Sequence, residues 1–163
     1  MMNTRLIIFI IPLLFFFNNQ TYAEIKNRII VTVDDSAITT LDLINEIKLV
    51  NITSGGKLSQ MDKGSIEQYG VRSLINKSIK KNEVEKYNLP NISNYDFNLE
   101  TKKIENNLNI PEKDIKTIFK EQQLPFKFLQ EKINLDFKWN ELIFILYKDK
   151  ISINEKEVDE QLN

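Results

Sequence analysis

The chain of 163 residues contains no histidine and no cysteine, and its 22 basic and 23 acidic residues nearly balance. Without cysteine there are no disulfides, no thiol chemistry and no cysteine-ligated zinc, and without histidine the commonest general base and metal ligand is missing. Any catalysis would have to use carboxylates, lysine, tyrosine or serine, and we expect no catalytic residues, metal or cofactor. A net charge of -1 gives no electrostatic reason to expect nucleic acid as a partner.

The apolar fraction of 42% and the charged fraction of 28% are typical of a globular chain, and the length favours one domain. The first 23 residues have the three regions of a secretory signal peptide. Arg5 precedes the apolar stretch Leu6–Phe17, and a polar segment then leads to a small residue, Ala23. We therefore predict cleavage between Ala23 and Glu24, export to the periplasm and only transient contact with the membrane.

The alternative for this leader is an uncleaved anchor, and its length argues against it. Twelve helical residues span about 18 Å, whereas the hydrocarbon core of a bilayer is roughly 30 Å thick. An exported chain without disulfides must be stabilised by packing, which favours a periplasm over a disulfide-rich extracellular setting.

Residues 24–163 are predicted to form one mostly α-helical domain that begins with a short β-hairpin. Ile29–Val33 is a β-branched run, Asp34 and Asp35 provide turn chemistry, and a short second strand follows. Thr39 with Asp42 then forms the capping-box pattern that opens a helix.

Further helices follow, separated by turn and cap residues. A Gly- and Ser-rich stretch predicts a flexible loop at about 52–64. Ser93 with Asp96 is a second capping pattern, and Pro111 and Pro125 stand where the first turn of a helix tolerates proline. Asn154 with Glu157 repeats the capping pattern and predicts a truncated or linker helix at 152–163. The predicted helices cover residues 41 to about 51, 65 to about 87, 94 to about 108, about 111 to 121, and 125 to about 148.

The longest predicted helix is rich in aromatic residues, more than one core-facing stripe can hold. Phe126, Phe137 and Phe144 lie at spacings that suit one face, whereas Phe128 and Trp139 point elsewhere. The segment 142–147 is apolar all round, which predicts a helix buried on several sides. The surplus aromatics are candidate peptide-contact residues, because unfolded polypeptides bind through apolar burial: Phe126, Phe128, Phe137, Trp139 and Tyr147.

Four short sequence strings and their order along the chain resemble the amino-terminal domain of the SurA-type periplasmic chaperones, which belong to the parvulin-type peptidyl-prolyl isomerase family. The similarity covers nearly all of residues 25–163. Its strings are Ile-Val-Thr-Val-Asp-Asp-Ser-Ala-Ile-Thr-Thr-Leu-Asp-Leu at 30–43, Asn-Leu-Pro-Asn-Ile-Ser at 88–93, Leu-Pro-Phe at 124–126 and Ile-Asn-Glu-Lys-Glu-Val at 153–158.

The resemblance implies an ATP-independent chaperone module that holds unfolded or outer-membrane polypeptides. It does not imply isomerase activity, because parvulin catalysis depends on His and often Cys or Asp, and the chain ends where the parvulin domain would begin. In the family a carboxy-terminal helix completes the core, so its absence predicts an open apolar groove for a client, a second copy or a helix-bearing partner. Lys80, Lys81 and Gln123 depart from the family pattern, which is apolar at the first two positions and Gly at the third.

Two alternatives remain open. In the first, the chain is the amino-terminal part of a parvulin-type isomerase whose catalytic domain is missing or separate. In the second, it is an interaction subunit anchored in the membrane by its leader.

Overall fold

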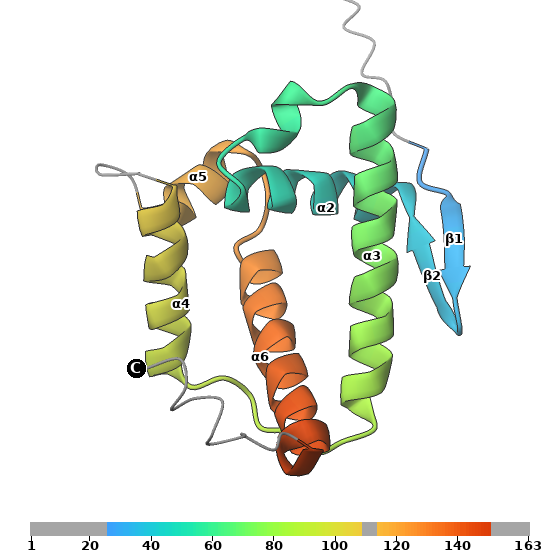
Figure 1. Ribbon diagram of the computed structural model, residues 1–163. Coiled ribbons are helices and arrows are strands. Elements are labelled where there is room, and N and C mark those ends of the chain that lie inside the picture. Colours follow the sequence, from blue (N-terminus) through green and yellow to red (C-terminus); the bar gives the residue numbers. More distant parts are fainter. Residues whose placement is uncertain (1–25, 109–113, 151–163) are drawn as a thin grey trace, which may run out of the picture.

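A computed structural model of the chain describes residues 26–108 and 114–150, and in this part five α-helices follow a two-stranded antiparallel hairpin (Figure 1). The predicted mostly helical fold with a short hairpin is confirmed. The predicted signal peptide, its cleavage site at Ala23 and Glu24, and the predicted helix at 152–163 lie outside the described residues.

The hairpin consists of β1 (Ile29–Val33) and β2 (Ser36–Thr39), joined by the two-residue turn Asp34–Asp35. Asp34 has a positive φ of 50°, a conformation that Asp tolerates better than most residues. The Asn82 side-chain amide donates a hydrogen bond of 2.8 Å to the Asp34 carboxylate. Since Asn82 lies on α3 (Lys63–Glu85), this contact ties the turn to the long helix.

Helix α2 (Thr40–Thr53) begins at the predicted capping box. The backbone N–H of Thr39 donates to the Asp42 carboxylate at 2.8 Å, and the Asp42 N–H donates to the Thr39 hydroxyl at 3.3 Å. The helix continues to Thr53, and the 3-10 helix η2 (Lys57–Gln60) follows, so only part of the predicted loop at 52–64 is irregular. Gly55 and Gly56 turn the chain there with φ of 68° and 80°, which a β-carbon would oppose.

Three of the remaining helices have side-chain caps, of which only the one at Ser93 was predicted. Asp62, Ser93 and Asp114 each accept a hydrogen bond from a backbone N–H three residues further on. The predicted role of Pro111 lies outside the described residues. The elements are α3, α4 (Asn94–Asn107), α5 (Ile115–Glu121), α6 (Lys127–Tyr147) and the 3-10 helix η3 (Lys148–Lys150).

Figure 1 shows α6 between α4 and α3. Helix α2 runs across the bundle at the level where α6 begins, and α3 continues beyond this crossing. The core sits at this level of the bundle. One cluster joins α2, α5 and the first half of α6, and a smaller one joins the hairpin, α2 and α3. The buried members are Leu49, Ile52, Ile115, Phe119, Leu124, Leu129 and Ile133 in the first cluster, and Ile38, Leu43 and Leu74 in the second.

The last turns of α6 differ from the prediction. The segment is helical, but it is not buried on several sides: Leu142 is buried, whereas the next five residues are 37% to 62% exposed. The reason is that the main cluster on α6 ends at Ile133, and no cluster of the described residues includes the last turns. The apolar run therefore lies at the surface.

Candidate functional site

The most unusual surface of the described residues is the exposed apolar end of α6, which we define as Ile143–Tyr147. Phe144 is 62% exposed and Tyr147 is 48% exposed, and the three aliphatic residues between and before them are also exposed. Successive helical residues point about 100° apart, so five in a row present apolar surface around the whole circumference. Patches of this kind on soluble proteins mark binding surfaces.

Other exposed aromatic side chains lie at the same end of the bundle. The end of α3, the start of α4 and the end of α6 all lie on the side of the bundle away from α2 (Figure 1). Tyr87 directly follows α3 and is exposed, and Tyr95 in the first turn of α4 is 77% exposed.

The predicted peptide-contact residues at the start of α6 pack against the core. The Phe126 ring packs edge-on against Phe97 and Phe119, with ring centroids 6.3 Å and 5.5 Å away. Phe128 is half-buried and packs against the same cluster. These two half-buried side chains stabilise the fold and offer less surface to a peptide than the exposed end of α6 does.

The other three candidates lie further along α6. Phe137 and Trp139 are half-buried, and the Lys80 ammonium group stands 5.8 Å from the centroid of the Trp139 ring. Tyr147 is exposed, with Lys150 5.0 Å from its ring centroid. Of the five candidates, only Tyr147 belongs to the exposed apolar end. The sequence signal for the rest of this surface is the uninterrupted apolar run at 142–147, although such a run predicts a buried helix.

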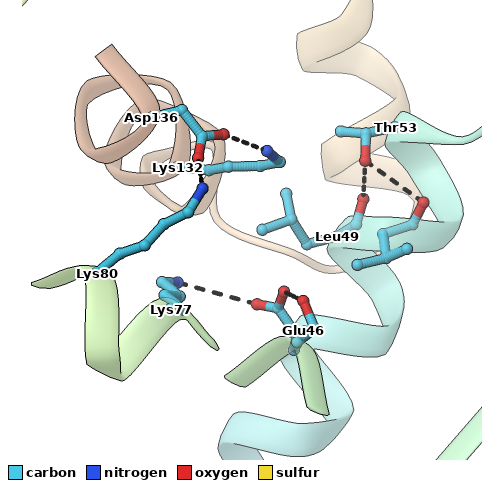
Figure 2. A network of polar contacts seen from close by, with 9 residues as sticks. Glu46, Leu49, Thr53, Lys77, Lys80, Lys132 and Asp136 are labelled. Carbon is cyan, nitrogen blue, oxygen red and sulfur yellow. Dashed lines mark hydrogen bonds and ion pairs between the residues drawn. The ribbon is translucent and has the colours of Figure 1, made fainter. Parts of the chain in front are cut away.

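A second feature is a cleft of about 440 Å³ between α2, α3 and α6. Figure 2 shows its polar contacts: Lys80 of α3 and Lys132 of α6 reach toward Asp136, and Lys77 faces Glu46. Aliphatic side chains, among them Leu49 and Leu135, complete the wall. The cleft is therefore not the purely apolar groove that the resemblance predicted, since charged groups form much of its lining.

Asp136 connects two helices within this cleft. Its carboxylate accepts a hydrogen bond of 2.9 Å from Lys80 across the α3–α6 interface and one of 2.5 Å from Lys132 on its own helix. Partial burial raises the pKa of Asp136, but the hydrogen bonds and charges of Lys132 and Lys80 together outweigh it, so the pKa lies below the ordinary value of 3.8. The carboxylate is therefore ionised at neutral pH and holds both lysines.

Glu46 is the one charged residue of the described chain that is buried, with 6% of its surface exposed. It occupies the core face of α2, between Leu43 and Leu49 at helical spacing. The Ser73 hydroxyl donates a hydrogen bond of 2.6 Å to one carboxylate oxygen, and Lys77 lies 3.9 Å from the other. The α2–α3 contact thus combines apolar packing with a hydrogen-bonded charge.

The two lysines that depart from the family pattern have different roles. Lys80 bonds to Asp136 and so links α3 to α6. Lys81 is exposed and pairs with Glu85 at 3.8 Å along the same helix. Gln123 has a φ of 53°, so the position that the family pattern gives to Gly does adopt a left-handed conformation.

In the described residues no group of three or more acidic side chains could hold a metal ion, and no helix there combines the length and apolarity needed to cross a membrane. Comparison of the chain with models of known protein families, with curated proteins and with solved structures gave no match. The resemblance to SurA-type chaperones stays a prediction.

Proposed function

We propose that the chain is an ATP-independent chaperone module of the periplasm that holds unfolded polypeptides, including those destined for the outer membrane. The observation that carries the proposal is the exposed apolar end of α6, where five consecutive apolar residues from Ile143 to Tyr147 are exposed. The order of sequence strings that resembles SurA-type chaperones and the predicted signal peptide are consistent with it.

The physical basis of holding is apolar burial. Each square ångström of apolar surface removed from water contributes about 25 cal/mol, and this attraction does not depend on direction. A helix end that is apolar on every side, such as Ile143–Tyr147, can therefore contact extended segments of many different sequences. Such binding follows mass action and needs neither a nucleotide nor a catalytic residue.

The test is the suppression of aggregation. An unfolded β-barrel membrane protein is diluted from urea into buffer with a molar excess of the purified chain, and light scattering is followed. We expect the wild-type chain to suppress scattering. A double variant, Phe144→Ser with Leu146→Ser, should lose most of this effect, because both side chains belong to the exposed apolar end.

The matched control removes two apolar side chains that are equally exposed elsewhere. Leu41→Ser with Ile79→Ser changes residues of α2 and α3 that are 47% and 45% exposed. This control should suppress aggregation as the wild type does, and both double variants should keep the helical circular dichroism spectrum. Absence of suppression by the wild type, or equal loss in both variants, would contradict the proposal.

A further inference from the structure

The cleft between α2, α3 and α6 carries an excess of positive charge. Four cationic side chains line it, Arg72, Lys77, Lys80 and Lys132, whereas only Glu46 and Asp136 are acidic. The cleft thus has two more positive than negative charges, although the chain as a whole has a net charge of -1. A concave site with an excess of one sign concentrates ligands of the other.

Several of the donors in this cleft are open to a ligand. Arg72 is exposed, and its guanidinium group makes no hydrogen bond or ion pair with any described residue. Lys80 and Lys132 each direct one bond to Asp136, while their side chains remain 33% and 40% exposed. An ammonium group has three N–H donors, so each lysine retains donors for an anion.

Packing alone does not account for these charges. Polar and charged side chains between helices cost desolvation, and apolar residues of similar volume are often as stabilising or more so. The chain places Lys80, Asp136 and Lys132 between α3 and α6, and Glu46 with Lys77 between α2 and α3. Binding of an anionic ligand to the surplus cations would explain why charged side chains are placed between these helices.

The walls also define the kind of anion. Leu49, Val50 and Leu135 provide aliphatic surface, and the Tyr69 side chain is exposed at the cleft. A volume of about 440 Å³ suits a small organic molecule or the end of a peptide. Because aliphatic side chains share the lining with the cations, a carboxylate on an apolar body would cover surface that inorganic phosphate leaves exposed to water.

We infer that this cleft binds a carboxylate carried on an apolar body, with Arg72 and the lysines holding the carboxylate and the aliphatic wall contacting the body. The inference does not rest on the chaperone proposal, because the cleft and the exposed end of α6 have no residue in common.

The first experiment compares N-acetyl-leucine with its amide by isothermal titration calorimetry on the purified chain. The acid should bind, and the amide, which lacks the charge, should bind about tenfold more weakly or not at all. Equal binding of acid and amide, or binding of neither, would overturn the inference. Tighter binding of inorganic phosphate than of N-acetyl-leucine would overturn the choice of ligand class.

Variants locate the site. Arg72→Gln should weaken N-acetyl-leucine about tenfold, because one charge-assisted contact is lost. Arg28→Gln is the matched control: Arg28 is also exposed and lies outside the cleft, before β1, so the same loss of charge there should leave binding unchanged. Asp136→Asn should strengthen binding, since it removes a negative charge from the wall, and a purely structural role of Asp136 predicts no gain.

The carboxylate could belong to the end of a polypeptide or to a small carboxylic acid, and a peptide ending in leucine distinguishes these two sources. If the free-acid peptide binds more tightly than N-acetyl-leucine and the amidated peptide does not bind, the site recognises polypeptide carboxyl ends. If the peptide binds no better than N-acetyl-leucine, the ligand is a small carboxylic acid. Either result supports the carboxylate site, whereas no effect of Arg72→Gln would place the ligand elsewhere and contradict the inference.

Discussion

Gly70 of α3 lies directly against Leu43 of α2. A β-carbon built on Gly70 would stand only 2.6 Å from Leu43 Cδ1 and 2.9 Å from Ile47 Cγ1. The absence of a side chain at Gly70 thus sets how closely the two helices approach. Alanine here would gain about 1 kcal/mol of helix propensity. The overlap should cost more, so we expect Gly70→Ala to destabilise the fold by about 1–2 kcal/mol net.

The free energy of unfolding of the Gly70→Ala chain is measured by urea titration with circular dichroism as the signal, and Gly64→Ala is the control. Gly64 is in the first turn of the same helix and exposed, and the nearest atom to its β-carbon would be a carboxylate oxygen of Asp62 at 3.3 Å. Gly64→Ala should be neutral or slightly stabilising. A Gly70→Ala chain as stable as the wild type would show that α2 and α3 can separate without cost.

The contrast between helix caps and helix contacts shows what the sequence can predict. The capping box at Thr39 and the side-chain cap at Ser93 were predicted correctly because each depends on two residues three positions apart. The contact between Gly70 and Leu43 joins residues that are far apart in the chain, and no local pattern specifies it. Likewise, the apolar run at 142–147 predicts a helix but not its surroundings, since exposure depends on which other helices extend that far.

The aromatic candidates illustrate the same limit. Helical spacing placed Phe126 and Phe144 on one face, yet Phe126 packs against Phe119 whereas Phe144 is exposed. The two residues are about five turns apart, and the main core cluster extends along only about the first two of these turns. The cleft charges were not predicted at all, because Arg72, Glu46 and Lys132 come together only when three helices meet.

Phe126 and Phe144 should therefore respond differently to truncation. Phe126→Ala should lower the free energy of unfolding by about 2–3 kcal/mol, because it removes ring contacts with Phe97 and Phe119. Phe144→Ala should change stability by less than about 0.5 kcal/mol, because that side chain is 62% exposed. Thermal melts of both variants test the pair, and equal losses would show that the end of α6 is buried in solution.

Gln123 is the residue where a glycine should stabilise the fold. It follows α5 with a φ of 53°, and its N–H donates to the Lys120 carbonyl at 3.0 Å, while the Leu124 N–H donates to the Phe119 carbonyl at 2.9 Å. This is the hydrogen-bond pattern of a Schellman motif, in which glycine is preferred at the left-handed position. We expect Gln123→Gly to raise stability by about 1 kcal/mol, measured as a higher urea midpoint. A lower midpoint would mean that Gln123 makes a contact stronger than its backbone strain.

Asp136 should make stability depend on pH in the acid range. Its pKa in the folded chain lies below 3.8 because Lys132 and Lys80 donate to the carboxylate and outweigh the effect of burial. The stabilisation is therefore fully present above about pH 4 and is lost as the pH falls through the lower, folded-state pKa. Unfolding at pH 6 and pH 2.5 should show a larger drop for the wild type than for Asp136→Asn.

The N-cap residues Asp62 and Asp114 have lowered pKa values too, through hydrogen bonds from Ser65 and Thr117 respectively. Both remain in the Asp136→Asn chain, so the difference between the two chains isolates the contribution of Asp136. Equal drops in the wild type and the variant would mean that the lysine contacts add no stability.

Site-specific photo-crosslinking tests most directly whether the exposed end of α6 binds clients. A benzophenone amino acid replaces Phe144, which is 62% exposed, and in a second chain it replaces Leu41, which is 47% exposed on α2 and lies outside the cleft. Each chain is mixed with an unfolded β-barrel protein and irradiated. We predict strong crosslinks to the client from position 144 and few from position 41. Equal yields at both positions, or none at 144, would contradict the proposed function.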